Sequence, residues 1–86
     1  MSMKSIRLSG HAKDQIVFRG ASEEEVIEAI KTSEWQRAGL DRFECKKDFP
    51  YDKEWNKVYY KTKQVRPIFI EEEKEILVIT VYTYFF

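Results

Sequence analysis

Residues 19–33 decide the fold and read Arg-Gly-Ala-Ser-Glu-Glu-Glu-Val-Ile-Glu-Ala-Ile-Lys-Thr-Ser. Ser22 followed three residues later by Glu25 matches a capping box, in which each side chain bonds the backbone of the other residue. The run of glutamates also suits the positive end of a helix dipole. The apolar residues that follow form one stripe. The stretch therefore predicts a helix that begins after Ser22 and ends near residue 32 or 33.

A second, shorter helix is predicted immediately before this one, over residues 10–19. Its expected apolar side consists of Ala12, Ile16 and Phe18. Gly20 follows directly, at the position where a left-handed helix cap favours glycine. Ahead of this helix, residues 4–8 alternate between polar and apolar, which is typical of a short half-buried strand.

Strand patterns replace helix patterns from residue 35 onward. Residues 42–47 and 55–62 alternate, and residues 49–53 between them are predicted to be a loop. Pro67 lacks an amide hydrogen, so we expect its strand to be at an edge of the sheet or to begin just after it. Residues 71–75 are charged and predict a hairpin turn. Residues 76–84 are apolar on both faces and predict a central strand covered on both sides.

The expected order of elements is thus β-α-α-β-β-β-β. Because the helices come early and the strands late, the chain is predicted to be α+β rather than a series of βαβ units. We expect the two helices to pack on a twisted antiparallel sheet. A chain of 86 residues has room for a single domain, residues 1–86.

Charge is zero overall but unevenly distributed. Residues 37–66 hold nine basic and five acidic side chains, whereas residues 67–86 hold one basic and four acidic ones. The basic, aromatic middle of the chain is compatible with an anionic partner. No stretch approaches the roughly 20 apolar residues of a membrane helix, so we expect no membrane association.

The cysteine and histidine content limits the chemistry. Cys45 is the only cysteine and cannot form an internal disulfide, which favours a reducing, cytoplasmic environment. We expect it to be a buried structural residue rather than a nucleophile. One His and one Cys do not make a typical zinc site, and no glycine-rich phosphate loop is present. Neither a metal nor a cofactor is therefore expected.

One candidate site stands out in the first helix. His11, Gln15 and Arg19 are spaced four apart and share one helix face. His titrates near neutral pH, and Arg presents a planar fork to phosphate or carboxylate. An ordinary exposed helix face also carries such residues, so the spacing is compatible with a site and with a plain solvated surface.

Residues 10–22, Gly-His-Ala-Lys-Asp-Gln-Ile-Val-Phe-Arg-Gly-Ala-Ser, together with the closing residues 79–82, Ile-Thr-Val-Tyr, resemble a small bacterial family, domain-of-unknown-function family 4258. The resemblance implies a fold like that of RelE/ParE-like toxins and related metal-independent ribonucleases. His11 and Arg19 match family positions, and Thr80 matches the closing strand. Gln15 departs from the pattern, because an arginine is usual there, and the site has one positive charge fewer.

By this resemblance the chain is expected to cleave RNA through attack of a 2′-hydroxyl on the adjacent phosphate, without a metal. His11 is then the base or acid, and Arg19 stabilises the phosphate. The remaining expected roles are positioning or proton donation (Thr80, Tyr82) and substrate binding (Gln15, Lys57, Lys61). RNA and an antitoxin-like protein are the partners implied.

The residues themselves also allow a second function. Zero net charge, Gln15 in place of arginine and the aromatic C-terminal residues 82–86 also suit a non-catalytic interaction module. An exposed aromatic end is a natural surface for a protein partner or a homodimer.

Overall fold

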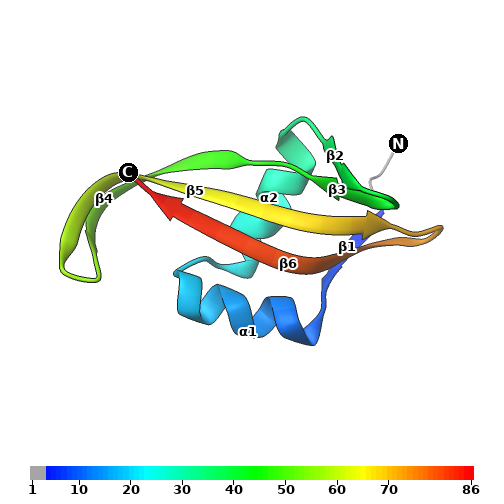
Figure 1. Ribbon diagram of the computed structural model, residues 1–86, viewed down its shortest axis with the longest axis horizontal. Helices are drawn as coiled ribbons and strands as arrows, with labels where there is room; N and C mark the ends of the chain where they lie inside the picture. The colour runs from blue at the N-terminus through cyan, green and yellow to red at the C-terminus, as the bar shows by residue number, and fades with distance from the viewer. Residues whose placement is uncertain (1–3) are drawn as a thin grey trace.

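The computed structural model describes residues 4–86, which form two helices and six strands within 42 × 25 × 23 Å (Figure 1). The elements follow one another in this order: β1 (Ser5–Leu8), α1 (Gly10–Arg19), α2 (Glu23–Thr32), β2 (Gln36–Gly39), β3 (Arg42–Glu44), β4 (Lys47–Trp55), β5 (Val58–Glu71) and β6 (Glu75–Phe85).

Both helices begin and end where their local signals predict. The Ser9 hydroxyl accepts from the amide of Ala12 at the start of α1, and Gly20 ends that helix with φ +72°. At α2 both bonds of the capping box are present, between Ser22 and Glu25. These caps satisfy amides that have no partner inside the helix, so local sequence is sufficient to set the boundaries.

The sheet has the order β1-β6-β5-β3-β2, and β4 also pairs with β5. All neighbours are antiparallel except β1 and β6, which are parallel. The α+β class is confirmed. The expectation of a purely antiparallel sheet is wrong at β1. The predicted strand order is also wrong, because β2 and β4 were not anticipated and because β5 is one continuous strand where two strands, over residues 55–62 and near Pro67, were expected.

The predicted loop at residues 49–53 is wrong, since these residues belong to β4. Asn56 and Lys57 form the turn instead, both with positive φ, and they divide the single strand expected over residues 55–62. An irregular register between Pro50 and Lys53 breaks the alternation of β4. Pairing with β5 across this two-residue turn, rather than an unbroken alternation, therefore makes the segment a strand.

Pro67 is buried in the middle of β5, contrary to the expected edge or strand start. Its carbonyl accepts from the amide of Cys45 at 3.4 Å, so its missing amide faces the gap between β3 and β4. Two residues lie between Glu44 and Lys47, and two lie between their partners Ile68 and Val65 on β5, so the register is unbroken across the gap. β3 and β4 thus form two parts of one line of pairing along β5. The pairing is interrupted opposite Pro67, which has no amide hydrogen to donate.

A β-bulge at Ile79 sets which residues of β6 face the core. Val78 lies opposite Phe69 while Thr80 lies opposite the adjacent Ile68, which leaves Ile79 unmatched. Burial accordingly switches from even to odd positions, with Val78 buried before the bulge and Val81 after it. The even-numbered Thr80 and Tyr82 are thereby turned away from the core.

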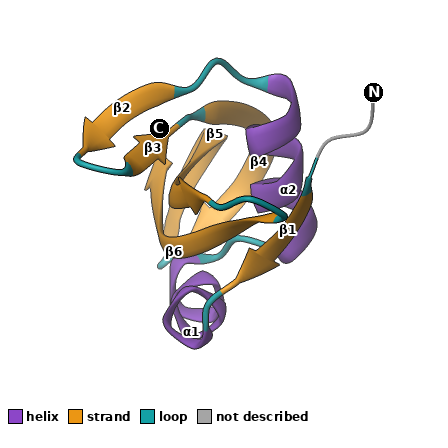
Figure 2. Cartoon of the chain, turned by 90° about the vertical axis from the view of Figure 1, so that its right-hand side faces the viewer, coloured by secondary structure: helices purple, strands orange, loops and turns teal. Residues whose placement is uncertain are grey.

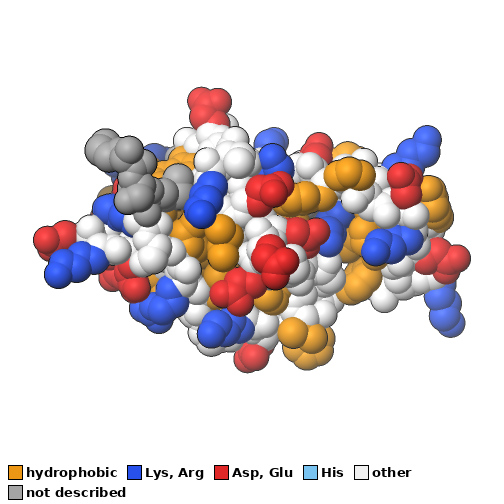
Figure 3. All heavy atoms as spheres, turned by 180° about the vertical axis from the view of Figure 1, so that it is seen from behind, with side chains coloured by type: hydrophobic (Ala, Val, Ile, Leu, Met, Phe, Trp, Pro, Cys, Tyr) orange, Lys and Arg blue, Asp and Glu red, His pale blue; other side chains and the backbone are white. Residues whose placement is uncertain are grey.

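α2 covers one face of the sheet, and α1 lies along its β6 edge (Figure 1 and Figure 2). In Figure 1, α2 lies behind β5 and β6, α1 runs below β6, and neither helix crosses the near face of these two strands. Figure 2 shows α2 to one side of the sheet and α1 beneath it. The opposite view carries scattered charges of both signs with hydrophobic groups between them (Figure 3). We call the near face of β5 and β6 in Figure 1 the outer face.

One core lies between α2 and the sheet. It combines residues of both helices and three strands with Cys45, which lies between β3 and β4: Leu8, Ala12, Val26, Ala29, Ile30, Cys45, Val65, Phe69, Ile76, Val78 and Val81. On the outer face Leu77 and Ile79 remain half-buried, so β6 is central in the sheet but covered fully on one side only.

Phe18 was expected on the apolar side of α1 but is 80% exposed, and its neighbour Val17 is 75% exposed. Gln15 and Arg19 take the inward positions instead. Ala12 and Ile16 do pack against the core as expected, while Gln15 contacts the backbone and a polar side chain of β6.

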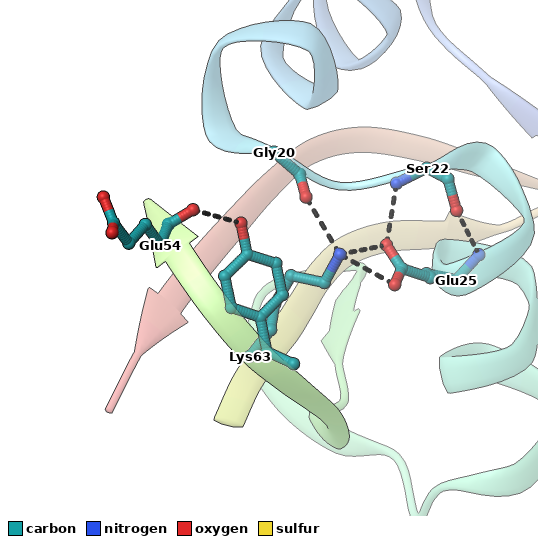
Figure 4. A network of polar contacts seen from close by, with 6 residues as sticks. Gly20, Ser22, Glu25, Glu54 and Lys63 are labelled. Carbon is teal, nitrogen blue, oxygen red and sulfur yellow. Dashed lines mark hydrogen bonds and ion pairs between the residues drawn. The ribbon is translucent and has the colours of Figure 1, made fainter. Parts of the chain in front are cut away.

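A network of polar contacts ties the helix junction to β5 (Figure 4). The ammonium of Lys63, a buried residue, donates to the carbonyl of Gly20 at 2.9 Å and to the carboxylate of Glu25 at 2.8 Å. Glu25 also accepts from the amide of Ser22. One carboxylate therefore both caps α2 and neutralises a buried cation.

Candidate functional site

α1 follows the edge of β6 at the point where β1 stops pairing with it. The last partners are Leu8 and Val78, and the amide of Ser9 donates to the carbonyl of Val78 before the chain turns into the helix. Gln15 then accepts from the amide of Val81 at 2.8 Å and from the hydroxyl of Thr80. Gln15 therefore satisfies a strand edge that would otherwise lack a partner.

Arg19 and Tyr82 meet one turn further along α1. The guanidinium carbon of Arg19 lies 5.1 Å from the centroid of the Tyr82 ring, within the range of a cation–π contact. Among the described residues, no carboxylate forms an ion pair with Arg19. The ring of Tyr82 thus holds the guanidinium of Arg19 in place, and no described carboxylate neutralises its positive charge.

A second contact between an arginine and a tyrosine ring lies beside this pair. Arg66 of β5 lies directly opposite Tyr82, and its guanidinium carbon is 5.3 Å from the centroid of the Tyr84 ring. We call these four residues (Arg19, Tyr82, Arg66 and Tyr84) the Arg–Tyr ladder. Cations and rings alternate along it on the outer face.

His11 stands apart from the ladder. It is exposed in the first turn of α1, and its side chain makes no hydrogen bond or ion pair with any part of the chain the structure describes. Eight residues separate it from Arg19, which corresponds to about 12 Å along the helix axis. The predicted stripe is therefore split: Gln15 and Arg19 contact β6, while His11 faces solvent.

The two lysines predicted to bind substrate lie on the hairpin of β4 and β5. Lys57 is in its turn with φ +69°, and Lys61 is exposed near the irregular register of β4. No contact joins either lysine to His11 or Arg19 within residues 4–86. Of the seven predicted residues, the structure brings together four: Gln15, Arg19, Thr80 and Tyr82.

A hollow of about 220 Å³ lies beside the ladder. Its lining carries charges of both signs and one buried thiol: Glu34, Gln36, Glu44, Cys45, Lys46 and Arg66. Burial, with a smaller effect of Glu44, raises the pKa of the Cys45 thiol to about 12. A thiol that stays protonated is a poor nucleophile, which agrees with the structural role expected for Cys45.

Other kinds of site find no support in the described part of the chain. Residues 4–86 hold no group of three or more His, Cys, Asp or Glu side chains placed to bind a metal ion. In the same residues, neither helix has the length and apolar character needed to cross a membrane.

Comparison with protein-family models, with curated proteins and with solved structures produced no match to this chain.

Arg66 and Tyr84 were not singled out from the sequence. A signal existed, since Tyr82 and Tyr84 are two residues apart and share a face of any strand. Nothing local reveals that Arg66 pairs with Tyr82, because this register depends on the hairpin between residues 71 and 75 and on the bulge at Ile79.

Proposed function

We propose that this protein is a toxin-like, metal-independent endoribonuclease of the bacterial cytoplasm, held by an antitoxin-like partner, with a RelE-like fold. The observation that carries the proposal is the placement of Arg19 over Tyr82 on a face that neither helix crosses. A pre-positioned guanidinium beside a phenol suits a phosphate undergoing displacement.

In the proposed reaction the 2′-oxygen bonds to the adjacent phosphorus as the bond to the 5′-oxygen breaks. The 2′-hydroxyl proton goes to a base, and the leaving oxygen receives a proton from an acid. Arg19 stabilises the charge that develops on the non-bridging oxygens. Tyr82, which lies beside Arg19, is assigned as the acid that protonates the leaving oxygen, and solvent water takes the proton of the 2′-hydroxyl.

Gln15 and Thr80 act as positioning groups in this scheme. Their mutual hydrogen bond, together with the bond from Val81, fixes α1 against β6. His11 lies about 12 Å from Arg19 along the helix axis, too far for both side chains to act on one phosphate. The expected role of His11 as base or acid is therefore not kept in the proposal, and His11 is assigned to contact a neighbouring part of an RNA strand that extends along α1.

The test is incubation of the purified protein with mixed RNA in the presence of EDTA. We expect cleavage by the wild type and a loss of roughly 100-fold or more in Arg19→Ala and Tyr82→Phe. Lys13→Ala is the matched control, since Lys13 is an exposed cation on the same helix. Absence of cleavage, or equal cleavage by Arg19→Ala, would falsify the proposal.

A second candidate, a non-catalytic interaction or dimerisation module, is favoured by the exposed apolar side chains of α1. Val17 and Phe18 are adjacent and largely exposed, and Phe86 is 57% exposed. Phe85, in contrast, stacks on Trp55 with ring centroids 5.0 Å apart, so only part of the aromatic end is free. Light scattering of the wild type and of Phe18→Ser distinguishes a self-associating chain from a monomer.

A further inference from the structure

We infer that the Arg–Tyr ladder is a binding track for single-stranded RNA, in which Arg66 and Tyr84 form a second contact beyond Arg19 and Tyr82. The inference rests on the proposed function, because it specifies how the substrate is held. It is carried by the alternation of cation and ring: Arg19 over Tyr82, Tyr82 opposite Arg66, and Arg66 over Tyr84.

Both arginines keep their hydrogen-bond donors free for a ligand. A guanidinium that stacks on a ring uses its flat face, and its N–H groups point outward in the plane. Neither Arg19 nor Arg66 forms an ion pair within the described residues, whereas Lys4, Arg7, Lys47 and Lys63 all do. Free, pre-oriented guanidinium groups in series match the repeated phosphates of a nucleic acid strand.

The rings supply the second component of the track. Tyr82 and Tyr84 stand on the same face of β6, about 7 Å apart along the strand. Tyr84 is 45% exposed. Unpaired bases stack on aromatic rings and on guanidinium planes, and the ladder presents both kinds of surface.

The positions of the ladder residues also set the path of a bound RNA strand across the sheet. Arg19 lies on α1, Tyr82 on β6 and Arg66 on β5, so these three residues cross the sheet from the helix toward β3. Arg66 in turn borders the hollow beside β2 and β3. A strand that follows the ladder therefore runs across β6 and β5 and ends at this hollow.

The ladder contains stacking surfaces and phosphate donors rather than paired groups that read base edges. Binding is therefore expected to depend weakly on sequence. In a duplex the bases are stacked and paired, and they cannot reach the rings. The track thus prefers a single strand to a duplex.

The experiment measures fluorescence anisotropy of a fluorescein-labelled oligouridylate with 2′-O-methyl groups, which cannot undergo attack by a 2′-hydroxyl. Wild type, Arg66→Ala and Tyr84→Ala are compared at several salt concentrations. Arg37→Ala and Tyr59→Ala are matched controls: Arg37 stacks on Phe43 at 5.7 Å outside the ladder, and Tyr59 is 56% exposed.

We expect Arg66→Ala and Tyr84→Ala each to weaken binding roughly fivefold or more, as loss of one stacked base would. Arg66→Ala should also reduce the slope of log affinity against log salt by about 0.7, the value for one phosphate contact of a single strand. Tyr84→Phe keeps the ring and should bind like the wild type, which separates loss of stacking from loss of folding. Both control variants should retain wild-type affinity.

Some results would overturn the track: no binding of the single strand by the wild type, equal binding of a duplex, or an Arg66→Ala effect no larger than that of Arg37→Ala. Cleavage of native RNA that is unchanged in Arg66→Ala and Tyr84→Ala would overturn the track and leave the proposed ribonuclease standing. Binding with the expected variant effects, but without cleavage of native RNA, would support the track and remove the ribonuclease.

Discussion

The ammonium of Lys63 lies 2.8 Å from each carboxylate oxygen of Glu25, and this pair joins the middle of the sheet to the first turn of α2. Lys63 is 8% exposed, and its other hydrogen bond goes to the carbonyl of Gly20. Because a buried cation needs a partner, the pair constrains where the α1–α2 junction rests on β5.

Replacement of Glu25 should be among the most destabilising changes on α2. Glu25→Ala removes the partner of a buried ammonium and one bond of the capping box, so we expect a loss of about 3 kcal/mol in the free energy of unfolding. Urea denaturation measures it. Glu24→Ala, in the same helical turn but exposed, is the control and should cost little. Equal effects of the two substitutions would show that the pair with Lys63 contributes nothing.

Gln15 should act through its side-chain oxygen alone. Both of its bonds, from the Val81 amide and from Thr80, are accepted by Oε1. Gln15→Ala leaves a part-buried amide without a partner and should cost about 1–2 kcal/mol in urea denaturation. Gln15→Glu keeps an acceptor at the same place and should recover most of that loss. If both variants lose the same stability, the edge bond is not what holds α1 to β6.

Gly20 should not tolerate alanine. Its φ is +72°, and an added Cβ would lie 2.7 Å from a ring carbon of Trp55. Strain and overlap together should cost roughly 2 kcal/mol or more in thermal or urea unfolding. Gly10→Ala is the control, because that position has open space and begins α1, so the change should be neutral or stabilising. A well-tolerated Gly20→Ala would contradict the contact with Trp55.

Cys45 should be unreactive in the folded protein and should make stability sensitive to high pH. Burial raises the pKa of its thiol from 9.0 to about 12, so between these values the unfolded chain releases a proton that the folded chain retains. The free energy of unfolding should therefore fall by at most about 1.4 kcal/mol per pH unit in this window from Cys45 alone, and only a small part of this loss should occur below pH 9.

The comparison of wild type with Cys45→Ala isolates this contribution from that of the other titrating groups. The variant should lose less stability between pH 8 and pH 10 than the wild type. Labelling with a thiol reagent at pH 8 should be slow in buffer and fast in urea. Fast labelling without denaturant would mean that the thiol is accessible and its pKa is ordinary.

The elements with strong local signals were predicted well. The capping residues of α2, Gly20 after α1 and the alternation in β1 each depend on neighbours within a few residues. β4 was missed because its alternation is interrupted by a bulge, and Pro67 was misplaced because one hydrogen bond can be omitted where β3 gives way to β4. Both errors concern how one strand pairs with another, which the alternation within a single strand does not reveal.

The residues of the candidate site were likewise predictable from the sequence only in part. Helix and strand periods are local properties, so they place His11, Gln15 and Arg19 on one helix and Thr80 and Tyr82 on the closing strand without knowledge of the fold. The packing of α1 along β6 brings Gln15 and Arg19 to that strand and leaves His11 in solvent, and no local pattern reveals it. The position of Arg66 between Tyr82 and Tyr84 also depends on tertiary structure, because a bulge of one residue at Ile79 reverses which side chains of β6 share a face.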